Sequence, residues 1–163
     1  CVEKGFDKLY TKLKPEIIYN LNNTKIINNN LLITGHSLGS ALATLLAYDL
    51  LNNKYPYNIT LMTFGSPRVG NFEFVKDFMN HKITSYRITH YYDIVPHIPQ
   101  EILNYKHVPN EVWYNKDNTD YKVCDDSRGE DDSCSNSCGP LHCDSIDNHM
   151  NYMGVNMGSE GDC

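Results

Sequence analysis

Hydrophobic residues along this chain follow two alternating patterns. In residues 2–19 they recur every three or four positions, the spacing of an amphipathic helix, and Pro15 should kink that helix or begin a new first turn. Short apolar runs, by contrast, predict buried strands. The expected order is helix 2–19, strand 31–34, helix 38–52, strand 59–64, helix 71–80 and strand 83–92. Strands that alternate with helices indicate βαβ units and a parallel sheet, so the predicted fold class is α/β.

The pattern changes after Pro99. Short strand-like runs and a final helix are expected at 105–108, 111–115, 121–124 and 145–155. Residues 125–143 are acidic and rich in Ser and Cys, which predicts a loop held by disulfides rather than by a core. We find no internal repeat and no second domain. The sequence therefore predicts a single domain over residues 1–163, with a disulfide-pinned loop at 124–143.

Composition narrows the class of protein. A chain of 163 residues can bury one sizeable core, and 40% hydrophobic and 21% charged residues are ordinary for a globular domain. A net charge of −6 argues against a nucleic-acid-binding protein, which usually has a basic face. The longest apolar runs are much shorter than the roughly 18 residues that a membrane-spanning helix needs.

The cysteines indicate an oxidising compartment. An even set of six in a chain of this size is typical of a disulfide framework in a secreted protein: Cys1, Cys124, Cys134, Cys138, Cys143 and Cys163. Glycosylation sequons at Asn22 and Asn58 agree with secretion. A zinc site around His142 is disfavoured, because the chain has no CxxC pair and adjacent His142 and Cys143 would strain a tetrahedral shell. Since no signal peptide precedes Cys1, we expect a mature product, a processed fragment or a trimmed chain.

One short segment carries the first candidate chemistry. Gly-His-Ser-Leu-Gly at 35–39 follows a predicted strand and opens a predicted helix, which is the context of a nucleophile elbow. In such an elbow Ser37 sits on a sharp turn, and the two glycines leave no Cβ where the strand and helix backbones nearly touch. The N–H of Leu38 can then donate to an oxyanion. The alternatives are an incidental serine in a glycine-rich turn, and a phosphate-binding loop, which would need more glycines and a following Lys-Ser or Lys-Thr.

A serine nucleophile needs a histidine base, and the base needs an acid that orients it. In hydrolases of this architecture the order along the chain is serine, acid, histidine. Asp93 directly follows the strand at 83–92 and is the candidate acid, with a loop-capping role as the alternative.

The histidines that follow Asp93 compete for the role of base: His97, His107, His142 and His149. The first shares the loop of Asp93, the second falls in a predicted strand arm, and the third lies among the cysteines. Elimination therefore favours His149, whose apolar neighbours would dock its segment against the core. His36, beside the serine, is expected to pack behind the elbow.

These motifs resemble the class 3 (fungal-type) lipases and their feruloyl esterase relatives. The similar blocks run in order along nearly the whole chain: VEKGFDKLYTKLKPEI, LLITGHSLGSALATLLAYDL, TFGSPRVGNFEF, YRITHYYDIVPHIP, YKHVPNEVWY and CDSIDNHMNYMGV. The resemblance implies an α/β-hydrolase fold with Ser37 as nucleophile, Asp93 as acid and His149 as base. It also implies that the Leu38 N–H is one oxyanion donor. Ser40 stands where the family usually has glycine, a minor departure within a helix.

The chain differs more from the family pattern at its beginning. The resemblance implies that the family's first strands, lid and second oxyanion donor precede the part that this chain matches. We therefore expect this chain to lack the N-terminal strands and the lid segment. A disulfide-linked or tightly associated N-terminal chain could supply them, as could residues outside this sequence.

The sequence alone does not choose among the possible cysteine pairings. The resemblance supports a Cys124–Cys134 disulfide, and we also prefer Cys138–Cys143. Cys1 and Cys163 would then pair with each other or with cysteines on the missing segment.

The expected reaction is hydrolysis of carboxylic (acylglycerol) esters through an acyl-enzyme, which requires no metal or organic cofactor. The expected partner is a lipid or other ester substrate at a transient lipid interface, and the expected location is outside the cell or in the secretory-pathway lumen. Val95, Ile98 and Ile102 could line an acyl pocket, although a plain core role fits them equally well. Two alternatives stay open: a feruloyl or sugar-ester esterase, and a non-catalytic lipid-binding or assembly subunit with a retained triad.

Overall fold

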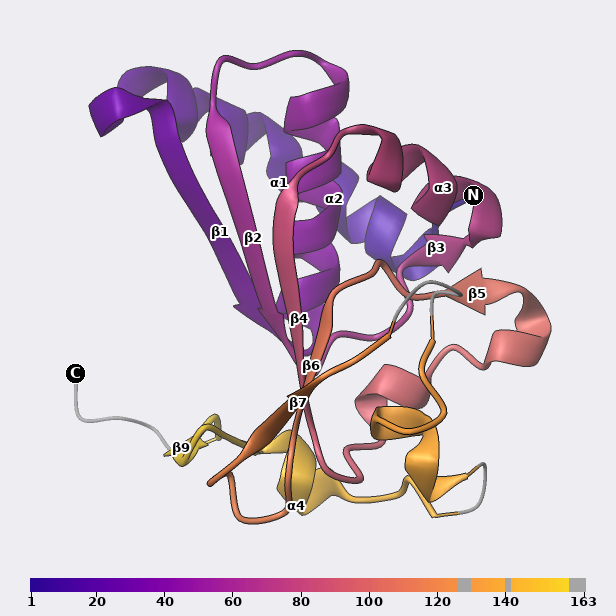
Figure 1. Ribbon diagram of the computed structural model, residues 1–163. Helices are drawn as coiled ribbons and strands as arrows, with labels where there is room; N and C mark the ends of the chain where they lie inside the picture. Colours follow the sequence, from indigo (N-terminus) through magenta and orange to yellow (C-terminus); the bar gives the residue numbers. More distant parts are fainter. Residues whose placement is uncertain (126–129, 140–141, 159–163) are drawn as a thin grey trace.

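The computed structural model describes residues 1–125, 130–139 and 142–158 of the chain. Its centre is a sheet whose strands have the order β1-β2-β4-β6-β7 (Figure 1). These strands are β1 (Asn30–His36), β2 (Asn58–Phe64), β4 (Thr84–His90), β6 (Glu111–Tyr114) and β7 (Tyr121–Val123). The first four are parallel, and β7 pairs with β6 antiparallel. The α/β fold predicted from the sequence is confirmed, and β1, β2, β4 and β6 end along one edge of the sheet.

The main hydrophobic core lies between the sheet and the helices that pack on it. The longer helices are α1 (Lys4–Asn23), α2 (Leu38–Asn52) and α3 (Phe72–Asn80). α2 packs on β1 and β2, and α1 packs on α2, so both helices lie behind these strands in Figure 1. The buried side chains of Ala41 and Ala47 are small enough for α2 to lie close to its neighbours. α1 continues through Pro15 as one helix. No helix in the described part of the chain combines the length and hydropathy of a membrane span.

The opposite face of the sheet is partly open among the described residues. In β1 the buried Ile33 alternates with Leu32, which is 62% exposed, and in β4 the buried Ser85 alternates with Tyr86, which is 42% exposed. β1 also lies at the edge of the sheet, next to β2 alone. Parallel sheets are normally covered on both faces. This face and this edge are therefore available to further polypeptide.

Shorter elements fill the second half of the chain. They are β3 (Gly70–Asn71), β5 (Tyr105–Lys106), α4 (Ile146–His149), β8 (Asn151–Tyr152), β9 (Val155–Asn156), and the 3-10 turns Ile27–Asn29, Val95–His97, Glu101–Leu103 and Ser135–Cys138. The final helix predicted over 145–155 is wrong beyond His149. The backbone turns at Met153 (φ 53°) and Gly154 (φ 80°) and forms the antiparallel pair of β8 and β9 instead.

Disulfides and a buried ion pair hold the acidic loop. The disulfides are Cys124–Cys134 and Cys138–Cys143, which are the two pairs preferred from the sequence. Cys1 is exposed and forms no disulfide with another described residue, and Cys163 lies outside the described residues. Nε and Nη2 of Arg68 donate to the two carboxylate oxygens of Glu130, each at 2.6 Å. This ion pair ties the loop to the segment that follows β2.

Candidate active site

The turn between β1 and α2 places Ser37 at the carboxyl edge of the sheet. Its backbone has φ 56° and ψ −125°, a conformation that residues other than glycine rarely adopt. The Ser37 N–H donates to the carbonyl oxygen of Phe64 at the end of β2 (3.0 Å). The surrounding hydrogen bonds therefore hold a strained turn that presents the serine, as the elbow motif predicts.

The two glycines of the motif have different roles. A Cβ on Gly35 would lie 2.4 Å from the backbone carbon and oxygen of Gly39, so only glycine fits at Gly35. A Cβ on Gly39 would contact no described residue within 4 Å. The sequence-based explanation, that both glycines avoid a clash, is therefore wrong for Gly39. The strand and helix approach closely because Gly35 faces the backbone of Gly39.

Ser40 contributes more than the sequence suggested. It is fully buried, and its hydroxyl oxygen lies 2.6 Å from the carbonyl oxygen of Gly35 and 2.9 Å from that of Phe64. The same oxygen accepts a hydrogen bond from the Phe64 N–H (3.2 Å). The hydroxyl thus connects α2 to the ends of β1 and β2, just behind Ser37.

The structure brings Ser37, Asp93 and His149 together from three separate parts of the chain. Nε2 of His149 lies 2.8 Å from Oγ of Ser37, and Nδ1 lies 2.9 Å from Oδ2 of Asp93. Asp93 follows β4 and is 1% exposed, and His149 ends α4 and is 7% exposed. The second oxygen of Asp93 accepts from the Val95 N–H (2.8 Å). The arrangement has the spacing of a nucleophile, a base and an orienting acid.

Two residues at this site were missed from the sequence. The Tyr152 hydroxyl donates to Oδ2 of Asp93 (2.5 Å), and burial, followed by the charge and hydrogen bond of Asp93, raises the pKa of Tyr152 well above its usual value. Gly65 has φ 55°, and a Cβ there would lie 2.9 Å from that same oxygen and 3.0 Å from Nδ1 of His149. Gly65 directly follows β2 in a Gly-Ser-Pro sequence, which predicts a turn and nothing more. No periodic pattern of the sequence singles out Tyr152.

Leu38 is the first residue of α2, where a helix has N–H groups without intrahelical acceptors. Its N–H directly follows Ser37, the position of an oxyanion donor in a nucleophile elbow. The dipole of α2 adds positive potential at this end.

The other candidate histidines make their contacts elsewhere. Nε2 of His107 lies 2.7 Å from the Pro96 carbonyl oxygen, and burial lowers the pKa of His107 well below its usual value. Burial also lowers the pKa of His97, whose Nε2 lies 3.9 Å from Sγ of Cys138. His142 is exposed. The cysteines near His97 are bonded in a disulfide and so lack the thiolate that binds a metal.

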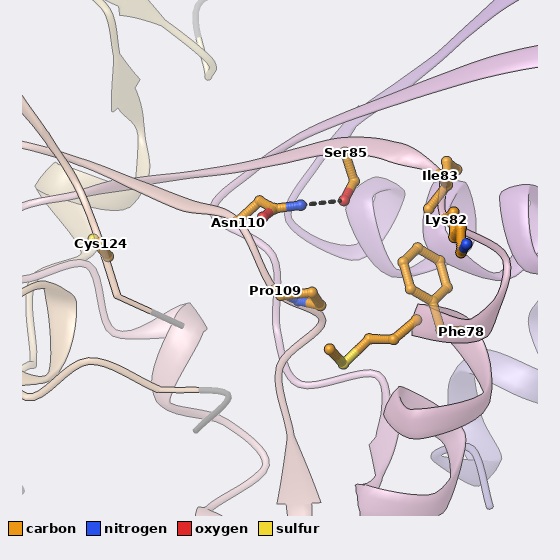
Figure 2. Close-up of a pocket in the computed structure, with 8 residues that line it drawn as sticks. Phe78, Lys82, Ile83, Ser85, Pro109, Asn110 and Cys124 are labelled. Carbon is orange, nitrogen blue, oxygen red and sulfur yellow. Dashed lines mark hydrogen bonds between the residues drawn. The ribbon is translucent and has the colours of Figure 1, made fainter. Parts of the chain in front are cut away.

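The proposed acyl-pocket residues lie on the loop after Asp93. Val95 is half-buried, whereas Ile98 and Ile102 are 46% and 88% exposed. A plain core role is therefore wrong for the two isoleucines. The cavity of about 350 Å³ in Figure 2 lies elsewhere, around Phe78 and the first residues of β4, at the end of the sheet opposite Asp93.

Comparisons with known proteins show which family the chain belongs to. A family model described as Lipase (class 3) matches residues 1–103. A Rhizopus niveus lipase is 37% identical over 131 residues, which cover 78% of this chain and 33% of that protein. The secreted mono- and diacylglycerol lipase 1 of Fusarium solani is 36% identical over 134 residues, which cover 76% of this chain and 39% of that protein.

Solved structures of lipases are also similar to this chain. The structure of a triacylglycerol lipase described as having a serine protease triad as its catalytic centre has a TM-score of 0.83 and 33% identity. The match covers 96% of this chain and 60% of that one. The chain thus spans between a third and three fifths of the length of these relatives. The family model and these relatives show that this chain belongs to the class 3 lipase family. Its mainly parallel sheet and the similar solved structures show that it has an α/β-hydrolase fold.

Proposed function

We propose that this chain carries the catalytic triad of a secreted lipase that hydrolyses acylglycerol esters through an acyl-enzyme. The observation that carries the proposal is the continuous path from Ser37 through His149 to Asp93, with contacts of 2.8 and 2.9 Å. The relatives reported above are named as lipases, and the Fusarium solani protein is named as secreted. The whole chain, residues 1–163, acts as a single domain in this proposal.

The reaction follows from the direction of these contacts. Nε2 of His149 takes the hydroxyl proton of Ser37 as Oγ attacks the ester carbonyl carbon. Asp93, held through Oδ1 by the Val95 N–H, orients the imidazole and stabilises its positive charge. The Leu38 N–H donates to the tetrahedral oxyanion. His149 then protonates the leaving alcohol, and it later activates the water that hydrolyses the acyl-enzyme.

A second oxyanion donor and the lid belong to a preceding segment or an associated chain in this proposal. The open sheet face at Leu32 and Tyr86, and the free edge of β1, are the surfaces that such a segment would cover. Removal of one oxyanion donor typically costs about a hundred- to a thousandfold in rate. The described chain alone should therefore be a weaker enzyme than the complete protein.

The acyl chain binds beside the loop after Asp93 in this proposal. Ile98 and Ile102 expose apolar surface there, next to Val95, and such surface suits a fatty acyl chain. The sequons at Asn22 and Asn58 are both exposed, as attachment of a glycan would require, and disulfides suit an oxidising compartment.

The proposal is tested by asking whether ester hydrolysis and labelling by a serine-specific probe depend on Ser37 and His149. In the complete protein, Ser37→Ala and His149→Ala should each lower kcat for a short p-nitrophenyl ester by about 10⁴-fold or more. A fluorophosphonate probe should label wild-type protein and not Ser37→Ala. Ser137→Ala removes an exposed serine and serves as the matched control. Absence of wild-type labelling would favour the non-catalytic subunit, and faster turnover of methyl ferulate than of emulsified acylglycerol would favour the sugar-ester esterase.

A further inference from the structure

Two histidines outside the triad hold the segment that carries His149. His36 is the last residue of β1, and His90 is the last residue of β4. Nε2 of His36 lies 2.7 Å from the carbonyl oxygen of His149, and Nδ1 of His90 lies 3.0 Å from the carbonyl oxygen of Asn148. Two successive peptide carbonyls are therefore bound by imidazoles that come from two different strands.

These carbonyls lie at the C-terminal end of α4, where the Met150 N–H also donates to the carbonyl oxygen of Asn148. α4 spans only Ile146–His149, and the last carbonyls of a helix have no partner within it. His149 is buried, so water cannot freely replace a missing donor. Ring N–H groups near a helix C-terminus satisfy such carbonyls and suit the negative end of the helix dipole.

The neighbours of His90 fix its tautomer. The side-chain oxygen of Asn118 accepts from the Met153 N–H (2.9 Å), which turns its amide nitrogen toward Nε2 of His90 (3.1 Å). Nε2 therefore accepts a hydrogen bond, and Nδ1 carries the proton that is donated to Asn148. Nε2 also lies 3.0 Å from the carbonyl oxygen of Lys116.

The His36 tautomer follows from its acceptor. A carbonyl oxygen can only accept, so Nε2 of His36 must carry a proton and donate it to His149. The two rings also lie against each other, with centroids 4.4 Å apart. His36 thus contacts both the backbone and the imidazole of His149.

We propose that His36 and His90 are positioning residues for the base. By holding the carbonyls of residues 148 and 149, they fix the backbone from which the imidazole reaches both Ser37 and Asp93. The inference rests on the proposed triad. An imidazole that must serve two partners at about 3 Å tolerates little displacement, since an error of about 1 Å can cost about a hundredfold in rate.

Side-chain amides give matched variants for each histidine. The amide nitrogen of Gln occupies the place of Nε2 of a histidine, and that of Asn occupies the place of Nδ1. His36→Gln and His90→Asn therefore keep the donor, whereas His36→Asn and His90→Gln keep polarity but misplace it. In the complete protein, the variants that misplace the donor should lose roughly ten- to a hundredfold in kcat for a soluble short ester, with KM unchanged. The variants that keep the donor should stay within about threefold of wild type.

Active-site titration with a fluorophosphonate normalises each rate to the amount of folded, reactive enzyme. Equal kcat per titrated site in all four variants would overturn the inference, as would equal losses in the donor-keeping and donor-misplacing variants. A loss that appears only in the number of titrated sites would also overturn it, because the histidines would then serve folding alone. If wild-type protein is neither labelled nor active, the proposed function fails instead, so the two failures are distinguishable.

Discussion

The Tyr152 hydroxyl and Nδ1 of His149 share one oxygen of Asp93. The tyrosine donates to Oδ2 at 2.5 Å, and the imidazole lies 2.9 Å from the same atom. Tyr152 and Asp93 are each 1% exposed, so no bulk water competes for this oxygen. Hydrogen bonds to a charged acceptor are stronger than those between neutral groups. Tyr152 therefore holds the Asp93 carboxylate in the orientation in which it also contacts His149.

Tyr152→Phe removes this donor and keeps the ring. We expect kcat/KM for a soluble ester to fall about tenfold and the free energy of unfolding to fall by about 1–2 kcal/mol, since a hydrogen bond to a charged group is lost. Because the pKa of Tyr152 is raised well above its usual value, the hydroxyl stays protonated and the loss should be the same from pH 7 to pH 9. Tyr121→Phe alters an exposed tyrosine and should change neither quantity.

Gly65→Ala tests how tightly the triad is packed. The added methyl group would lie 2.9 Å from Oδ2 of Asp93 and 3.0 Å from Nδ1 of His149, so one of these groups must move. We expect kcat/KM to fall by about a hundredfold or more. Gly139 also has a positive φ, 64°, and a Cβ there would meet no described residue within 4 Å. Gly139→Ala should share the backbone strain and leave the rate unchanged; equal rates for the two variants would contradict the prediction.

The elbow glycines form a second matched pair. In Gly35→Ala the new Cβ would press on the backbone of Gly39, and we expect a loss of about 3 kcal/mol or more in the free energy of unfolding. Gly39→Ala adds a Cβ in open space within a helix and should be neutral or stabilise by about 0.5–1 kcal/mol. Urea unfolding of both variants measures the difference. Similar midpoints for the two variants would contradict the prediction that glycine is required at Gly35 and not at Gly39.

Local signals made much of this site predictable from the sequence. The helix expected at 38–52 has those bounds in the structure, because Ala and Leu favour a helix and the elbow fixes its start. Ser37 and Asp93 follow strands that short apolar runs reveal. Chain order then limited the choice of histidine.

Contacts between distant segments could not be predicted. The contacts of Tyr152 with Asp93, and of His36 with the carbonyl of His149, join residues more than fifty positions apart. The end of α4 was misplaced because the turn at Met153 and Gly154 interrupts a sequence that is compatible with a longer helix. The local sequence permits both structures there, and only tertiary packing chooses between them.

The ion pair of Arg68 and Glu130 makes the free energy of unfolding depend on pH in the acidic range. Their side chains are 4% and 8% exposed, and two hydrogen bonds join them. Burial alone would raise the pKa of Glu130. The hydrogen bonds from Arg68 and nearby positive charges, those of Arg68 and Arg87 among them, outweigh it and hold the pKa at about 2, against a usual value of 4.5. A depression of this size corresponds to about 3 kcal/mol in favour of the folded state.

The sign of the pH dependence follows from that depression. The unfolded chain binds this proton more readily than the folded one, so the stabilisation is present above about pH 4.5 and is lost as the pH falls toward 2. Glu130→Gln should therefore lower the free energy of unfolding at pH 7 by up to about 3 kcal/mol, and its deficit should shrink as the medium approaches pH 2. Urea titrations between pH 2 and pH 7 measure this. Glu16→Gln, at an exposed position on α1, should follow wild type throughout, and a constant Glu130→Gln deficit at every pH would refute the linkage.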